Sequence, residues 1–179
     1  MKTTEILIAG FGGQGILFSG KFLAYKGLLE DLQVSWLPSY GPEMRGGTAN
    51  CNVILSDSPV GSPIITAPNV LIAMNLPSLE KYEDSVVSGG QIYVDSSLIN
   101  LKVKRDDVEV FYIPATQMAK ENGIGTLANM IIVGHLLENH PELSFDGVSA
   151  VVESLVPPKK AALKELNMKA LDLGKNYKS

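Results

Sequence analysis

Residues 3–16 read Thr3-Thr4-Glu5-Ile6-Leu7-Ile8-Ala9-Gly10-Phe11-Gly12-Gly13-Gln14-Gly15-Ile16, and this segment carries the strongest structural signal in the chain. An apolar run leads into a turn dense in glycine, and the turn leads into a stretch with apolar residues at helical spacing. This order predicts a buried strand, a tight loop with exposed backbone amides and the N-terminus of a helix, which together can hold an anion or contact another chain.

Three of these glycines follow the order G-x-G-x-x-G from Gly10, which invites a dinucleotide-binding interpretation. Such folds place an acidic residue near the end of the second strand. Here the expected second strand, 33–37, ends without a carboxylate, and Glu30 and Asp31 precede it. No Gly-Lys-Ser/Thr follows, so a Walker loop is excluded. Three interpretations remain open: a structural turn, a phosphate cradle or subunit contact, and a true NAD or FAD site.

Short apolar strands alternate with helical patterns along the rest of the chain. The expected strands cover 5–9, 33–37, 48–55, 70–74, 91–94 and 108–113, and the expected helices cover 14–30, 77–82, 126–138, 145–155 and 159–173. Several strands are apolar on both faces, which is typical of a parallel sheet covered on both sides. We therefore predict an α/β fold, a single domain over 1–179 with a doubly wound, mostly parallel sheet and helices on both faces.

Composition excludes several classes of partner. The chain has 179 residues, a formal net charge of −4 and no basic run longer than two residues, so nucleic acid is not an expected partner. No apolar run approaches the ~18 residues of a membrane span, and no secretory leader pattern opens the sequence. We expect a cytoplasmic protein that does not bind membranes.

The sequence offers no set of catalytic or metal-binding residues. Cys51 is the only cysteine, which excludes an intramolecular disulfide and a self-contained iron–sulfur cluster of about four thiolates. His135 and His140 have no acidic or thiol cluster beside them in the sequence, so we expect no metal site. We interpret His135 as a core residue of a helix and Cys51 as an inert core residue.

A second loop, Ser39-Tyr40-Gly41-Pro42-Glu43-Met44-Arg45-Gly46-Gly47, follows the second expected strand. Loops after the carboxyl ends of strands line the ligand crevice of an open α/β sheet, so the two loops should lie side by side. Arginine suits phosphate or carboxylate ligands. The structural alternative is a rigid loop in which Glu43 and Arg45 are solvated or paired with each other.

Together the two loops resemble the gamma subunit of 2-oxoacid:ferredoxin oxidoreductases. The Asn75-Leu76-Pro77 step and the turn before Tyr93-Val94-Asp95 are also similar, and the resemblance runs from Thr4 to about Lys169. It implies a complex that converts a 2-oxoacid, CoA and oxidised ferredoxin into acyl-CoA, CO2 and reduced ferredoxin. It also implies that alpha, beta and possibly delta subunits carry thiamine diphosphate, magnesium and iron–sulfur clusters, while this chain alone binds no cofactor.

The resemblance assigns the two loops to the region that binds the cofactor and the co-substrate CoA. The residues it assigns are Gly10, Gly12, Gly13, Gln14, Gly15, Tyr40, Gly41, Pro42, Glu43, Met44, Arg45, Gly46 and Gly47. Arg45 and the loop amides would position a CoA phosphate or close the active site, and Glu43 would orient Arg45. No residue is assigned a catalytic role.

The resemblance favours 2-oxoglutarate as substrate and leaves branched-chain 2-oxoacids, pyruvate and indolepyruvate open. Two alternatives come from other functional classes: a stand-alone nucleotide-binding or regulatory α/β module, and a free NAD(P)-linked reductase.

Overall fold

The computed structural model describes residues 2–39 and 48–178. The strands are β1 (Thr3–Phe11), β2 (Gln33–Ser39), β3 (Thr48–Ser56), β4 (Val70–Ala73), β5 (Gln91–Asp95) and β6 (Glu109–Ile113). The α-helices are α1 (Ile16–Leu29), α2 (Leu76–Tyr82), α3 (Ala115–Glu121), α4 (Ala128–Asn139), α5 (Val148–Leu155) and α6 (Ala161–Asn176), and the 3-10 turns are η1 (Glu83–Ser85), η2 (Pro141–Leu143) and η3 (Pro158–Lys160).

The six strands form one sheet in the order β2-β3-β1-β4-β5-β6. The pairs β1–β4, β4–β5 and β5–β6 are parallel, whereas β3 runs antiparallel to both β1 and β2. Because β1 and β2 both oppose β3, every strand except β3 points the same way. The predicted mostly parallel α/β sheet is confirmed, with one antiparallel strand inserted between β1 and β2.

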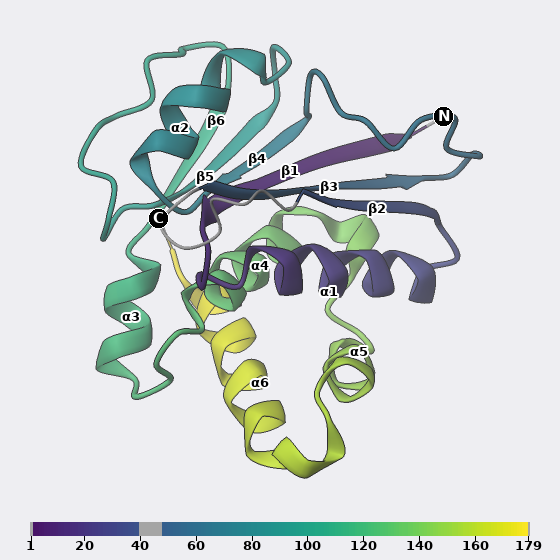
Figure 1. The fold of residues 1–179 in the computed structure, drawn as a ribbon, viewed down its shortest axis with the longest axis vertical. Helices are drawn as coiled ribbons and strands as arrows, with labels where there is room; N and C mark the ends of the chain where they lie inside the picture. The colour runs from purple at the N-terminus through teal and green to yellow at the C-terminus, as the bar shows by residue number, and fades with distance from the viewer. Residues whose placement is uncertain (1, 40–47, 179) are drawn as a thin grey trace.

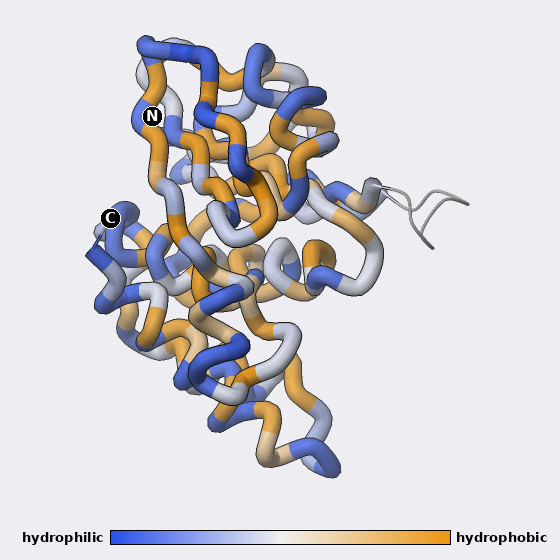
Figure 2. The backbone as a smooth tube through the Cα atoms, turned by 90° about the vertical axis from the view of Figure 1, so that its left-hand side faces the viewer, coloured by the Kyte–Doolittle hydropathy of each residue, from blue (hydrophilic) through white to orange (hydrophobic). Residues whose placement is uncertain are grey.

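Helices cover both faces of the sheet, but unequally. Figure 1 shows α2 on one face, and α1 and α4 on the other with α5 and α6 beyond them. The larger apolar core lies on the α1 side, and a smaller one lies beneath α2. In Figure 2 hydrophobic residues recur along the inner segments of the backbone, while many hydrophilic residues lie in turns at the outside. Burial of apolar surface therefore stabilises mainly the α1–α4 side.

Helices α4 and α6 pack backbone to backbone. A Cβ atom at Gly134 would overlap the carbonyl oxygen of Leu171, and one at Gly174 would overlap that of Ile131. Close packing of this kind leaves no room for another carbon atom. The two glycines therefore fix how closely α6 approaches the helix that covers the sheet.

The predicted elements are all present, and two features differ from expectation. Strand β2 continues through Pro38 instead of ending before it, which an edge strand tolerates because only one side of it is paired. Helix α3 was not predicted, since Pro114 indicated only the end of a strand. Its first turn is held by side chains from the end of β5: Asp95 accepts from Thr116 N (3.3 Å) and Ser97 Oγ accepts from Gln117 N (3.0 Å).

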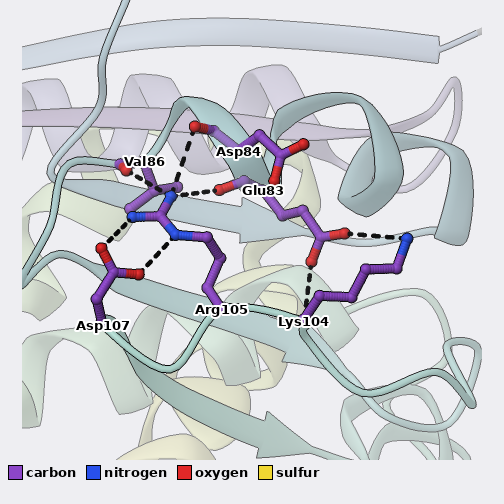
Figure 3. Close-up of polar contacts among 6 residues, drawn as sticks. All are labelled: Glu83, Asp84, Val86, Lys104, Arg105 and Asp107. Carbon is purple, nitrogen blue, oxygen red and sulfur yellow. Dashed lines mark hydrogen bonds and ion pairs between the residues drawn. The ribbon is translucent and has the colours of Figure 1, made fainter.

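Arg105 fastens the connection between β5 and β6 to the turn after α2 (Figure 3). Its Nη1 donates to the carbonyl oxygens of Glu83 (3.1 Å), Asp84 (3.5 Å) and Val86 (2.8 Å). Its Nε and Nη2 donate to the two carboxylate oxygens of Asp107, each at 2.6 Å. These bonds lower the Asp107 pKa to about 2. Arg105 therefore has a structural role.

We expect Gly174→Ala to destabilise the protein by about 1–3 kcal/mol, because a methyl group must displace the α4 backbone. This corresponds to a fall of roughly 2–4 °C in melting temperature per kcal/mol for a chain of this size. Thermal unfolding of Gly61→Ala provides the control, since a Cβ there meets nothing within 4 Å. Equal melting temperatures for the two variants would show that the helices do not pack as described.

We expect Asp107→Asn to lower the free energy of unfolding at pH 7. The Asp107 pKa is depressed from 3.8 to about 2, so the stabilisation is complete above the unfolded value and is lost as pH falls towards 2. Urea unfolding at several pH values should show that the difference in free energy of unfolding between wild type and variant shrinks as pH falls from about 4 to about 2. Asp106→Asn is the control for local charge, and a gap that stays constant with pH would contradict the assignment.

Candidate functional site

The carboxyl ends of five strands meet at one edge of the sheet, where ligands bind in open α/β folds. At this edge Phe11, the last residue of β1, pairs with Thr48. Ser39, the last residue of β2, pairs with Asn50, two positions further along β3. The residues that flank the second predicted loop thus lie at the same edge as the glycine loop: Thr48 beside Phe11, and Ser39 one strand further out, across β3. Tyr40, Gly41, Pro42, Glu43, Met44, Arg45, Gly46 and Gly47 themselves lie outside the described residues.

The glycine loop turns the chain from β1 into α1 within four residues. Gly13 has φ 93° and Gly15 has φ 73°, both in the left-handed region. A residue with a Cβ atom pays about 1–2 kcal/mol there. Gly15 is the N-cap of α1, and no side chain caps this helix end. The loop therefore leaves the first amides of α1 without an internal side-chain partner, as a site for an anion requires.

Gln14 closes the glycine loop from within. Its Oε1 accepts from Phe11 N (2.6 Å) and its Nε2 donates to the Met74 carbonyl (3.0 Å). The amide thus uses both its acceptor and its donor to join the end of β1 to the end of β4. Gly10 lies directly beneath: a Cβ there would come within 2.6 Å of Gln14 Oε1 and 2.8 Å of Met74 Cβ. Glycine at position 10 is required by this close approach.

Asn129, in the first turn of α4, supports the loop from the other side. It is 4% exposed, and its Nδ2 donates to the Gly15 carbonyl (3.1 Å) and to Ser19 Oγ (2.9 Å). The sequence analysis did not identify this residue. A polar side chain in the first turn of a largely apolar helix was the available signal, but the Gly15 carbonyl that it contacts lies 114 positions away in the sequence.

Asn75 adds polar groups at the end of β4. Its Oδ1 accepts from Ser78 N (2.9 Å) and caps α2. Its Nδ2 and the Ser78 hydroxyl are buried and have no hydrogen-bond partner among the described residues. Leaving such donors unpaired costs about 1–3 kcal/mol each.

The candidate nucleophiles and bases are structural. Burial raises the pKa of the Cys51 thiol to about 12, so the thiol stays protonated and unreactive at neutral pH. Burial lowers the pKa of His135, whose Nδ1 lies 3.2 Å from the Gly174 carbonyl. The rings of Tyr93, Phe111 and Tyr177 surround this histidine. The interpretations of Cys51 and His135 as core residues agree with this geometry.

The acidic residues near the first helix are placed away from the glycine loop. Glu30 is the C-cap of α1, at the opposite end of that helix from Gly15. It forms an ion pair with the buried amine of Lys26 and accepts from Ser144 Oγ (3.3 Å). No carboxylate of β2 as described takes the position that holds a ribose in dinucleotide-binding folds.

Within residues 2–39 and 48–178, no group of three or more His, Cys, Asp and Glu side chains could hold a metal ion. In the same part of the chain no helix is both long and apolar enough to cross a membrane. The candidate site as described consists of the glycine loop and the amide side chains of Gln14 and Asn129 that hydrogen-bond to it.

Comparison with known proteins gives the wider context. The family model for pyruvate ferredoxin/flavodoxin oxidoreductase matches residues 5–177. Ketoisovalerate oxidoreductase subunit VorA of Methanothermobacter marburgensis is 40% identical over 136 residues, 76% of this chain and 28% of VorA. The chain thus spans only about 28% of the length of that relative. 2-oxoglutarate synthase subunit KorC of the same organism is 35% identical and matches along nearly its whole length, 96% of this chain and 94% of KorC.

Two solved structures share the fold. The gamma subunit of a keto/oxoacid ferredoxin oxidoreductase from Geobacter sulfurreducens superposes with a TM-score of 0.80 at 30% identity, over 96% of this chain and 95% of that one. The 2-oxoglutarate:ferredoxin oxidoreductase from Magnetococcus marinus, with 2-oxoglutarate, coenzyme A and succinyl-CoA bound, superposes with a TM-score of 0.85 at 27% identity, over 98% of this chain and 31% of that one. The match to nearly all of its length places this chain in the pyruvate ferredoxin/flavodoxin oxidoreductase family.

Proposed function

We propose that this chain is the gamma subunit of a 2-oxoacid:ferredoxin oxidoreductase and helps to form the region that binds CoA. The observation that carries the proposal is the rigid glycine loop at the carboxyl edge of the sheet, with the uncapped start of α1 behind it. The ends of the Arg45-bearing loop lie at the same edge. Phosphate groups are the ligands that such helix ends and arginine side chains favour.

The reaction joins oxidative decarboxylation of a 2-oxoacid to thioester formation with CoA, and ferredoxin takes up the electrons. Thiamine diphosphate, with its magnesium ion, supplies the carbanion chemistry in such enzymes, and iron–sulfur clusters supply electron transfer. The described residues offer neither a metal-binding group nor a reactive thiol. We therefore assign these groups to alpha, beta and possibly delta subunits, and assign binding and orientation of CoA to this chain.

The preferred substrate is 2-oxoglutarate. KorC, named as a 2-oxoglutarate synthase subunit, matches nearly end to end, whereas the VorA match covers a fraction of a longer chain. Branched-chain 2-oxoacids and indolepyruvate are the competing substrates, because VorA and the IorB subunit of an indolepyruvate oxidoreductase are also similar. We place the complex, with ferredoxin as its electron acceptor, in the cytoplasm.

Affinity purification of the tagged chain from its own cell extract tests the assembly. The proposal expects thiamine- and cluster-binding subunits to co-purify, with CoA-dependent reduction of a viologen dye when 2-oxoglutarate is added. Assays with 2-oxoisovalerate, pyruvate and indolepyruvate identify the substrate. Recovery of the chain alone, without activity, would contradict the subunit assignment and favour a stand-alone nucleotide-binding module.

We expect Arg45→Ala in the assembled enzyme to raise KM for CoA about tenfold, the loss of about one charge-assisted hydrogen bond. KM for the 2-oxoacid should not change. Arg45→Lys keeps the charge but loses the two-pronged geometry of the guanidinium, so it should restore only part of the affinity. Steady-state kinetics at varied CoA provide the measurement, and an unaltered KM for CoA in Arg45→Ala would exclude this role.

We expect Gln14→Ala to loosen the glycine loop, because Phe11 N and the Met74 carbonyl lose their shared partner. The cost should be about 1–3 kcal/mol of stability, together with a lower kcat/KM for CoA. Gln117→Ala is the matched control, since this exposed glutamine of α3 donates through its side chain to Glu121 of the same helix (2.8 Å). If both variants show the same kinetics for CoA, the loop does not act on this substrate.

A further inference from the structure

A cavity of about 340 Å³ lies behind the glycine loop, between α1, α4, the end of α5 and α6. This volume is at the lower end of the range of small-molecule sites, ~300–1,000 Å³. Phe18, Leu127 and Leu163 contribute apolar walls, and none of the lining residues in the described part of the chain is a carboxylate. Among the described lining residues Lys160 is the one cation, and its side chain is exposed. The cavity therefore combines apolar surface with a preference for negative charge.

Three helices begin at this cavity. Their N-cap residues, Gly15 of α1, Leu127 of α4 and Lys160 of α6, all line it. None of the three helix ends has a side-chain cap or an acidic residue in its first turn. The first amides of a helix have no partner within the helix, and the helix dipole makes this end positive. Three such ends at one cavity favour an anionic group there.

Two buried amide oxygens independently indicate a ligand with hydrogen-bond donors. Asn129 and Asn167 are 4% and 3% exposed and both line the cavity. Their NH2 groups are already committed, Asn129 to Gly15 and Ser19, and Asn167 to the Leu163 carbonyl (2.7 Å). Both Oδ1 atoms are buried without a partner in the part of the chain that is described. These oxygens can only accept, so the missing partner must supply N–H or O–H groups.

We infer that this cavity binds an adenine nucleotide. The exocyclic amine of adenine carries two N–H donors for the two amide oxygens, and the faces of the base suit the apolar walls. The phosphates would lie towards Lys160 and the uncapped helix ends. Free ADP and the nucleotide end of CoA share this chemistry; only the second source rests on the function proposed above.

Calorimetric titration of the purified full chain with ADP and IDP tests the inference. IDP has a carbonyl where ADP has the amine, so it should bind about tenfold more weakly, the effect of losing one or two buried hydrogen bonds. Equal affinity for ADP and IDP would overturn the inference. So would the absence of ADP binding at about 5 mM, above the millimolar range of weak sites, since water would then satisfy the amide oxygens.

Two variants identify the site. Lys160→Ala should weaken ADP binding about tenfold, as expected for one charge-assisted contact, whereas Lys159→Ala, an exposed neighbour outside the lining, should not. Asn167→Leu should weaken ADP but not IDP, and it disturbs the fold little because Asn167 bonds only within its own helix. Equal losses in Lys160→Ala and Lys159→Ala would show that binding occurs elsewhere.

Competition distinguishes the two sources of nucleotide. If CoA displaces ADP and 4′-phosphopantetheine does not, the site takes the nucleotide end of CoA. If CoA binds without displacing ADP, the site takes a free nucleotide. The direct titration is separate from the kinetics of Arg45→Ala in the assembled enzyme, so failure of this site and failure of the proposed function give different results.

Discussion

One glutamine side chain joins the ends of the two central strands. Gln14 accepts from Phe11 N at the end of β1 and donates to the Met74 carbonyl just after β4. These two bonds constrain the path of the glycine loop between β1 and α1. The left-handed glycines at 13 and 15 make that path accessible, and Gly10 makes room for the glutamine. The direction of α1, and hence the position of its free amides, depends on this constraint.

The order of strands and helices could be predicted because each one depends on local pattern. Apolar runs, glycines and prolines mark β1, β4, β5 and the long helices within a few residues of their observed ends. Helix α3 was not predicted because its first amides donate to the side chains of Asp95 and Ser97, about 20 residues earlier in the sequence, so no local pattern marks its start. The antiparallel insertion of β3 likewise depends on pairing between strands, which no local pattern specifies.

The candidate site was predictable to a similar degree. The sequence indicated the glycine loop and its place at the carboxyl edge of the sheet, because strand direction and glycine spacing are local signals. It could not indicate that α4 and α6 bring Asn129 and Asn167 to the back of that loop, since this depends on the close packing of Gly134 and Gly174. The side chains around the loop are amides, and the one described thiol is buried and protonated at neutral pH.

Hydrogen exchange on the assembled oxidoreductase, with and without CoA, tests the central claim most directly, because it reports on the backbone amides of the glycine loop themselves. The account predicts that CoA slows amide exchange at residues 12–18, which cover the glycine loop and the first turn of α1. Amide exchange in the β5–β6 connection, which Arg105 holds, should not change. Protection confined to other parts of this chain, or to the partner subunits alone, would contradict it.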